Sequence, residues 1–269
     1  MRTRIAALAL ALGLVIAAPA PAASDARDDR WPELRQRLFG DRPIQEAGEV
    51  IGIDAPYRAS DAALVPVTVQ DLRPPGSEPA LRRLHLIVDN NPEPLAGVFR
   101  FGPAAGRVSL STRIRINAYT HVRAVAETAD GELLMGKRFV KASGGCSAPV
   151  GAEEAEALQD LGRIRMRRWP AEGPEGERVQ VMIRHPNYSG LQMDQLTRLY
   201  RPAHFVERLE VLRGAEPVLQ ADLTITLSRN PSLRFYVEPA PGKPLRVQAR
   251  DNEGNVFRGG ATGPAAPPG

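Results

Sequence analysis

The chain has 269 residues, with 35 Lys or Arg against 31 Asp or Glu and a formal net charge of +4 at pH 7. If Arg2 and Arg4 leave with an N-terminal leader, 33 basic residues face 31 acidic ones, a net charge of +2. So small an excess, scattered along the chain, argues against a nucleic-acid partner or a charged membrane surface. The 25 prolines and 24 glycines, in short clusters with few long helical patterns, favour an all-β protein.

The first residues have the layout of a secretory signal peptide. Two arginines precede an apolar run over residues 5–18, and Ala20-Pro-Ala22 offers small residues for cleavage. We predict a signal peptide over residues 1–23 and a periplasmic mature chain; an uncleaved membrane anchor is the alternative. No later apolar run approaches the ~18 residues that a membrane span needs, so no membrane association is expected after cleavage.

A short helix is expected over residues 31–39, because Trp31, Leu34 and Leu38 recur at helical spacing and Gly40 follows as a stop. Short alternating strands then predict one β-sandwich over residues 31–141. Its last two strands flank an Asp-Gly turn, which is a strong hairpin signal. The strands are expected at 51–57, 64–69, 83–88, 96–101, 108–116, 121–127 and 133–140.

A second β-sandwich is predicted over residues 162–258. A cysteine-bearing loop and linker, residues 142–161, joins the two; within it, residues 153–161 read equally as a short helix or a flexible acidic linker. The tail, residues 259–269, is of low complexity and is expected to be disordered. Strands of the second half are expected at 164–168, 178–184, 206–212, 217–223, 233–237, 245–250 and 256–257.

The loop between the halves carries Cys146, the one cysteine of the chain. Gly144 and Gly145 precede it, and Ser147-Ala-Pro149 follows. Such a run suits neither a helix nor a strand, so we predict an exposed, mobile loop with a functional thiol. The alternative is a small buried hydrophobe, which is the commoner role of a free cysteine. In an oxidising compartment an unpaired cysteine indicates an intermolecular bond or a reactive thiol.

No catalytic machinery accompanies the thiol in the sequence. Lys141 either lowers the thiol pKa or is simply solvated. His185 reads as a general base or, more simply, as the residue that orders the turn at Pro186. The four histidines are dispersed without metal-ligand spacing, so we expect no metal, no cofactor and no enzymatic activity. The histidines are His85, His121, His185 and His204.

Residues 178–257 resemble the SoxZ family. The motifs that carry the resemblance are Ile183-Arg-His-Pro186 with Ser189-Gly-Leu191, Arg213-Gly-Ala-Glu-Pro-Val218, Ser228-Arg-Asn-Pro231 with Leu233-Arg-Phe235, and Asp251-Asn-Glu-Gly254. The first half is similar to SoxY, through Val65-Pro-Val67, Asn91-Pro92 ahead of Phe99, and Asp130-Gly131 leading to Gly144-Gly-Cys146. The chain therefore resembles a fused SoxY–SoxZ protein, like the SoxYZ-like carriers associated with quinoprotein dehydrogenases.

This resemblance implies a fold and a function. Both halves would be immunoglobulin-like sandwiches, and Gly144 and Gly145 would form the arm that carries Cys146. Cys146 would hold sulfur intermediates covalently while periplasmic sulfur-oxidising or quinoprotein dehydrogenase enzymes act on them. In the SoxY family the arm ends the chain, whereas here the chain continues beyond Cys146.

Three hypotheses follow. In the first, the protein is a periplasmic carrier of a sulfur-containing or related small group, as in thiosulfate oxidation. In the second, it is a non-catalytic accessory module of a periplasmic quinoprotein (PQQ) dehydrogenase system, with Cys146 incidental. In the third, Cys146 links two copies of the chain through a disulfide.

Overall fold

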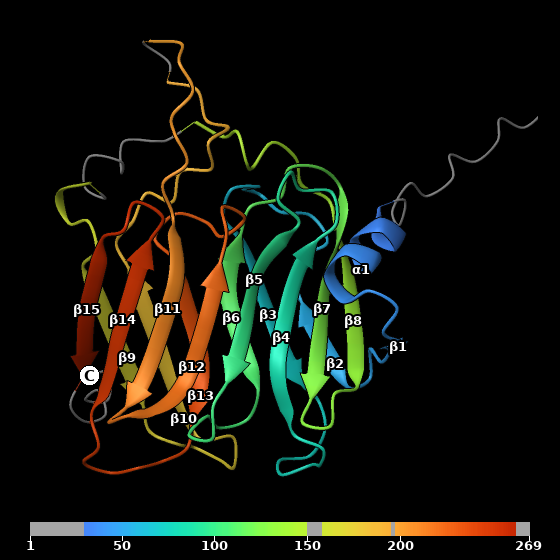
Figure 1. Ribbon diagram of the computed structural model, residues 1–269, viewed down its shortest axis with the longest axis vertical. Helices are drawn as coiled ribbons and strands as arrows, with labels where there is room; N and C mark the ends of the chain where they lie inside the picture. The colour runs from blue at the N-terminus through green and yellow to red at the C-terminus, as the bar shows by residue number, and fades with distance from the viewer. Residues whose placement is uncertain (1–29, 150–157, 195–196, 262–269) are drawn as a thin grey trace, which may run out of the picture.

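The computed structural model describes residues 30–149, 158–194 and 197–261, which form two stacked β-sheets and one nine-residue helix (Figure 1). The predicted signal peptide, most of the segment 153–161 and the tail beyond residue 261 lie outside the described residues. In the part of the chain that the structure describes, no helix has the length and apolar character needed to cross a membrane. The all-β prediction is confirmed.

The elements follow one another as α1 (Trp31–Phe39), β1 (Ile44–Glu46), β2 (Ile51–Asp54), β3 (Val65–Asp71), β4 (Leu81–Val88), β5 (Leu95–Phe101), β6 (Ser109–Ile114), β7 (Thr120–Thr128), β8 (Leu133–Val140), β9 (Ile164–Trp169), β10 (Glu177–Ile183), β11 (Val206–Arg213), β12 (Glu216–Leu223), β13 (Ser232–Val237), β14 (Leu245–Asp251) and β15 (Val256–Ala261).

The helix α1 forms as the sequence predicts. It buries Leu34 and Phe39 against apolar side chains of β4, β7 and β8, on the outer side of the sheet (Figure 1). Gly40 ends the helix with φ +62°, and its N–H donates to the carbonyl of Gln36. Glycine adopts this backbone conformation without the penalty that a Cβ would bring.

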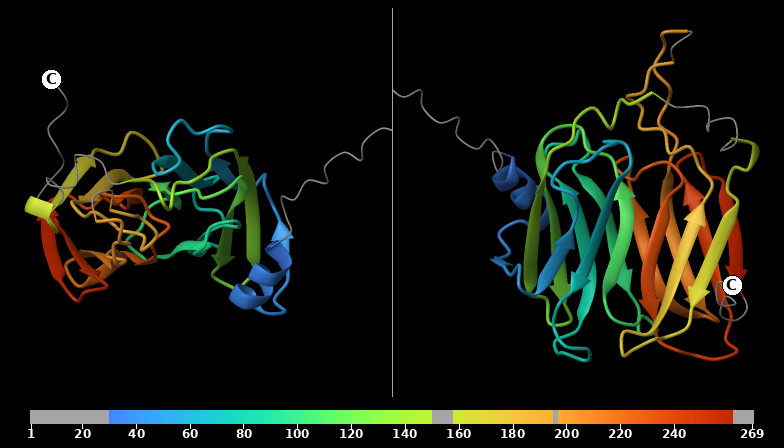
Figure 2. Two further views of the ribbon diagram at one scale, coloured as in Figure 1. Left: turned by 90° about the horizontal axis from the view of Figure 1, so that it is seen from above. Right: turned by 180° about the vertical axis from the view of Figure 1, so that it is seen from behind.

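Both halves of the chain contribute to both sheets. The nine-stranded sheet has the order β1-β8-β7-β4-β5-β12-β11-β14-β15, and the six-stranded sheet has the order β2-β3-β6-β13-β10-β9. In the larger sheet the halves meet where β5 pairs antiparallel with β12, from Leu219 opposite Phe101 to Leu223 opposite Gly97. In the smaller sheet β6 meets β13, with Arg234 opposite Ser111. Figure 2 shows the two layers from above and from behind.

One continuous core fills the space between the sheets. Phe99 and Leu110 of the first half belong to the same buried cluster as Val218 and Phe235 of the second. The sequence predicts two sandwiches joined through a loop and linker; the structure adds direct pairing of their edges. An edge strand leaves backbone N–H and C=O groups unpaired, and β5 and β12 satisfy one another.

Two further sequence predictions, a turn between β7 and β8 and a disordered tail, differ in outcome. The turn at Asp130-Gly131 joins β7 to β8 as predicted, with Gly131 at φ +92°. Disorder from residue 259 is wrong for residues 259–261, which extend β15 and pair with β14. Ladder pairing uses backbone groups, so Gly259 and Gly260 can join the strand without apolar side chains.

Candidate functional site

Cys146 lies at the end of the sandwich where β6, β8, β10, β12 and β14 end and β7, β11 and β13 begin. Connections of both halves therefore meet there. The connection between β10 and β11 projects beyond the sheets at this end, at the top of Figure 1. We call residues 141–149 the cysteine arm and residues 185–192 the covering loop.

The prediction that the loop exposes Cys146 is wrong. The side chain of Cys146 is 1% exposed and has no disulfide partner. Lys141 forms a β-bridge with Arg58, and the arm then makes a turn in which the N–H of Ser147 donates to the carbonyl of Gly144. The thiol is thus enclosed by chain that folds over it.

We call the buried position of Cys146 the seat. The two glycines of the arm explain how the backbone reaches it. Their N–H groups donate to the carbonyls of Asn117 and Ile116, both at 2.9 Å. Gly144 has φ +77°, a conformation that favours glycine. A Cβ on Gly145 would lie 2.0 Å from the carbonyl oxygen of Ala62. The glycines that predict flexibility from the sequence therefore let the arm pack closely.

The second half of the chain closes the seat. The hydroxyl of Ser189 donates to the carbonyl of Cys146, and the side-chain amide of Gln192 donates to the carbonyl of Ala148 at 3.3 Å. Ser189 is itself buried, at 3% exposure. The arm of the first half is consequently held by two side chains of the covering loop, and both bonds go to backbone oxygens of the arm.

Burial raises the pKa of the Cys146 thiol to about 11, and the positive charge of Arg115 opposes this rise. The thiol is therefore protonated at neutral pH, whereas the thiolate is the nucleophile. Lys141, which the sequence offered as the cation near the thiol, lies instead with its Nζ 4.9 Å from the centre of the Tyr57 ring. The cation that acts on the thiol is Arg115.

His185 orders the covering loop. Its side chain is fully buried, and its Nδ1 accepts the backbone N–H of Asn187 at 3.0 Å. Burial lowers the pKa of His185 to about 4, so the ring is neutral at pH 7. The turn-ordering role weighed from the sequence is confirmed, and no contact with Cys146 supports the general-base role.

His185, His204 and Asp251 place one possible ligand atom each within 4.8 Å of one another. His204 Nε2 lies 2.8 Å and His185 Nε2 3.5 Å from Asp251 Oδ2. Because His185 Nδ1 accepts a hydrogen bond, its proton resides on Nε2. A metal-ligating histidine instead offers a lone pair and donates from its other nitrogen. His204 is thus hydrogen-bonded to Asp251 at the end of β14, whereas His185 Nε2 has no hydrogen-bond partner and the His185 ring packs against that of His204, with ring centres 4.5 Å apart.

Sequence reasoning missed Arg115, Ser189 and Asp251 as site residues. Arg115 alternates with apolar Ile114 and Ile116, a pattern that usually places the charged side chain in solvent. It is buried because the second half packs on that face. Ser189 and Asp251 lie in motifs of the SoxZ resemblance, which was the only signal in the sequence that could have pointed to them.

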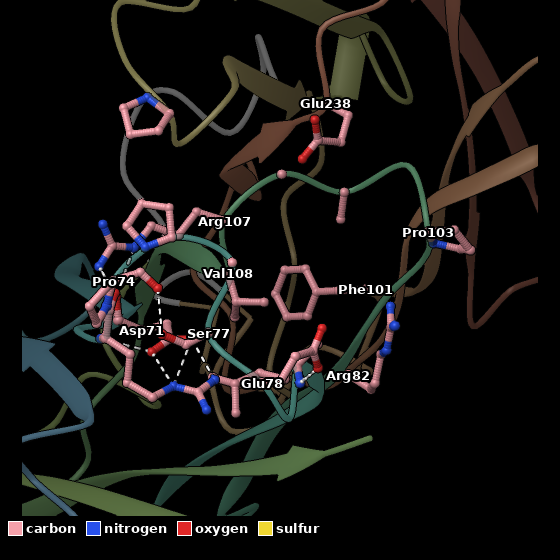
Figure 3. A pocket seen from close by; sticks show the side chains of 18 of the residues that line it. Asp71, Pro74, Ser77, Glu78, Arg82, Phe101, Pro103, Arg107, Val108 and Glu238 are labelled. Carbon is pink, nitrogen blue, oxygen red and sulfur yellow. Dashed lines mark hydrogen bonds and ion pairs between the residues drawn. The ribbon is translucent and has the colours of Figure 1, made fainter. Parts of the chain in front are cut away.

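A pocket of about 220 Å³ lies at the opposite end of the sheets, between the ends of β3 and β5 and the starts of β4 and β6 (Figure 3). Two of its arginines are already partnered. Arg73 pairs with Asp71 at 2.8 Å, and Arg107 donates to the backbone carbonyl of Asp71 at 2.6 Å and lies 3.7 Å from Glu175. This pocket is a junction between loops of the two halves and is separate from the cysteine.

The described residues thus define a class: a two-layer β-sandwich protein with one thiol on a glycine arm, enclosed by both halves of the chain. The sequence model of the family described as sulfur oxidation protein SoxY matches residues 35–146, and that of sulphur oxidation protein SoxZ matches residues 166–262. The chain belongs to these two families, joined in the order SoxY–SoxZ: it is a fused SoxYZ-like protein. The SoxY match ends at Cys146.

Among solved structures, the chain is similar to the sulfur carrier protein SoxY from Chlorobium limicola f thiosulfatophilum, with 28% identity over 42% of this chain and 92% of that one and a TM-score of 0.36. A BSP domain of a biofilm associated protein (11% identity, 81% and 30% covered, TM-score 0.25) and a β-glycosidase from Bacteroides vulgatus (10% identity, 85% and 26% covered, TM-score 0.25) also match. With TM-scores this low, these likenesses carry no weight for fold or function. No curated protein sequence matches the chain.

Proposed function

We propose that the chain is a periplasmic carrier that holds a sulfur-containing group covalently on Cys146 and presents it to partner oxidising enzymes. The observation that carries this proposal is the coincidence of the SoxY match, which ends at residue 146, with a lone cysteine on a Gly-Gly arm. The protein has the role of a holder, so the chemistry on the group belongs to its partners. Sulfur-oxidising enzymes are the expected partners, because SoxY and SoxZ are sulfur oxidation families.

The enclosed thiol makes the arm a two-position element in this proposal. In the seat, the free thiol of Cys146 is protonated and covered, so it does not react, and a group bound to the sulfur is shielded from solvent. Outside the seat, the thiol recovers an ordinary pKa near 8.5 and meets a partner enzyme. Two hydrogen bonds from Ser189 and Gln192 hold the closed position, each contributing about 0.5–1.5 kcal/mol. The backbone hydrogen bonds of Gly144 and Gly145 and the burial of Cys146 add to the cost of opening.

Intact-mass spectrometry of the protein purified without reductant from its native periplasm tests the proposal. We expect added mass on Cys146, located by peptide mapping, that a reductant removes because the group is held through an S–S bond. Cys146→Ser is the matched control and should carry none. A bare thiol under every growth condition would contradict the carrier role.

The predicted leader is tested by N-terminal sequencing of the same purified protein. Cleavage after the Ala-Pro-Ala run should give a mature chain that begins near Ala23. A chain from the periplasmic fraction that still begins at Met1 would contradict a cleaved signal peptide.

A second candidate function is a non-catalytic accessory module of a periplasmic quinoprotein dehydrogenase system. The burial of Cys146 to 1% exposure favours it, since a buried free cysteine is an ordinary core residue. A Cys146→Ser strain separates the two proposals. Retained dehydrogenase-dependent growth together with lost sulfur oxidation supports the carrier, whereas no defect in either supports the accessory module.

A further inference from the structure

Arg115 is a buried cation that the second half of the chain holds in place. Its side chain is 2% exposed. Nη1 donates to the backbone carbonyls of Ile225 at 3.2 Å and of Leu227, and the backbone N–H donates to the carbonyl of Thr226 at 2.8 Å. The guanidinium is therefore fixed by neutral acceptors on the connection between β12 and β13.

The charge of Arg115 has no counter-ion among the described residues. No carboxylate there forms an ion pair or hydrogen bond with it, and its buried Nε has no hydrogen-bond partner. The charges that act on it are those of Cys146 and of Arg229, a like charge. A buried, unpaired charge is costly, so a structure that keeps one calls for an anion at that place.

The cysteine arm lies directly beside this cation. Gly145, the residue before Cys146, donates to the carbonyl of Ile116, the residue after Arg115, at 2.9 Å. Cys146 and Arg115 are both buried to 2% exposure or less. A protonated thiol cannot neutralise Arg115, but an anionic group attached to that sulfur can. Guanidinium binds oxyanions through charge-assisted, geometrically defined hydrogen bonds.

We propose that Arg115 is the residue that recognises the cargo: it selects, for the closed seat, a Cys146 adduct that ends in an oxyanion, such as a sulfonate, over a neutral or cationic one. This inference rests on the proposed carrier function and adds the residue that recognises the charge of the carried group. Arg115 is a specificity-determining residue in this scheme, since it contacts the carried group and does not activate the thiol.

Three methanethiosulfonate reagents of similar length test the inference on the full purified chain: the 2-sulfonatoethyl, 2-hydroxyethyl and 2-aminoethyl compounds. The Cys146 thiol loses its proton to solvent, and the thiolate attacks the reagent's sulfenyl sulfur. One S–S bond forms, one S–S bond breaks, and methanesulfinate leaves. The products are disulfide adducts with charges of −1, 0 and +1. Labelling is driven to completion under mildly alkaline conditions and verified by intact mass.

We expect the thermal midpoint of the sulfonate adduct to exceed that of the hydroxyl adduct by about 3–8 °C, the shift that a modest ion-pair stabilisation gives a chain of this size. The ammonium adduct should lie below both. Arg115→Gln, which keeps a donor for the carbonyls but removes the charge, should abolish this order. The control Arg213→Gln removes an arginine that donates to the carbonyl of Ala104 at the opposite end of the sheets, and it should preserve the order.

Equal midpoints for the three wild-type adducts would overturn the inference, including the case in which every adduct leaves the seat. An unchanged order in Arg115→Gln would overturn it as well. If Arg115→Gln does not fold, the thermal midpoints of the three wild-type adducts still test whether the seat distinguishes their charges. These adducts are made chemically and need no native cargo. If the native protein carries adducts on Cys146 but the three chemical adducts have equal thermal midpoints, this inference fails and the proposed function stands. If the midpoints differ as expected but the native protein never carries an adduct, the proposed function fails and this inference stands.

Discussion

Two buried arginines show how differently two regions of this molecule treat a charge. Beneath helix α1, Arg123 is 1% exposed, its Nε donates to both carboxylate oxygens of Asp89 at 2.8 and 3.1 Å, and its guanidinium carbon lies 4.3 Å from the centre of the Trp31 ring. Beside the cysteine arm, Arg115 is buried equally well but has neutral acceptors only. The first region is electrostatically complete within one half of the chain. The second is assembled from both halves and lacks one negative charge.

The contrast separates a structural use of a buried cation from a binding use. A compensated pair such as Asp89–Arg123 leaves nothing for a ligand to supply. An uncompensated cation beside a thiol can be neutralised by one anionic group attached to that thiol. The predictions below test that contrast and the closure of the arm, from the largest expected effect to the smallest.

Removing each arginine should give unequal losses of stability. Arg123→Met takes a guanidinium away from the buried carboxylate of Asp89, and should lower the free energy of unfolding by about 3–5 kcal/mol. Arg115→Met leaves two backbone carbonyls without a donor but relieves an unpaired charge, so the loss should be about 1–2 kcal/mol. Urea unfolding at pH 7 measures both. A loss for Arg115→Met as large as for Arg123→Met would erase the distinction between the regions.

Adding a methyl group to the arm should unseat Cys146. In Gly145→Ala the new Cβ meets the carbonyl of Ala62, and overpacking of this kind costs about 2–3 kcal/mol. The open fraction of the arm, and with it the rate at which a neutral thiol reagent modifies Cys146, should rise roughly 30- to 150-fold.

Two other glycines provide matched controls for that experiment. Gly144→Ala meets no atom within 4 Å but has φ +77°, so it should accelerate the reaction less. Gly131→Ala, in the β7–β8 turn with φ +92°, should leave the rate unchanged. A Gly145→Ala protein that reacts at the wild-type rate would mean that the arm is not held by this contact.

Acid should weaken the covering loop through His185. Its pKa is about 4 in the folded protein and about 6.5 when unfolded. The unfolded chain therefore binds the proton more readily, and stability is full above pH 6.5 and falls as the pH drops toward 4. Between pH 7 and pH 5 this one group should remove about 2 kcal/mol.

The variant His185→Asn isolates this effect, because an asparagine side chain can accept the same N–H two residues ahead. Urea unfolding at pH 7 and pH 5 should show a smaller pH dependence for the variant than for the wild type. Identical pH dependence in both proteins would exclude His185 as the titrating group.

The smallest effect is expected from removing the hydroxyl of the covering loop that bonds the cysteine arm. Ser189→Ala removes the hydrogen bond to the carbonyl of Cys146, worth about 1 kcal/mol, and should speed modification of Cys146 about fivefold. Ser232→Ala removes a hydroxyl that bonds Gln180 on the second sheet and serves as the control. Equal rates in the two variants would show that the Ser189 hydroxyl does not hold the arm.

Much of the fold was readable from local patterns. Trp31, Leu34 and Leu38 at helical spacing predicted α1, and the alternation of Leu110, Thr112, Ile114 and Ile116 predicted the buried face of β6 and of the residues after it. The Asp-Gly pair predicted the β7–β8 turn. These features depend on neighbours within a few residues, so the sequence carries them directly.

The candidate site was only half readable. Cys146 and its two glycines stood out in the sequence, and the SoxY and SoxZ resemblances gave the class of protein. The exposure of Cys146 was predicted wrongly, because glycine is compatible both with a mobile loop and with a close backbone approach. The carbonyl of Ala62, more than 80 residues upstream, selects the second.

The sequence by itself therefore determined that this is a β protein with one cysteine and with two halves of the SoxY and SoxZ families in series. Only the tertiary structure decided that the halves share their sheets, that the thiol is covered, and that an arginine without a counter-ion lies beside it. The reason is physical: strand periodicity and turn chemistry are local. Burial and charge compensation depend on which distant segments come together, and here those segments belong to different halves of the chain.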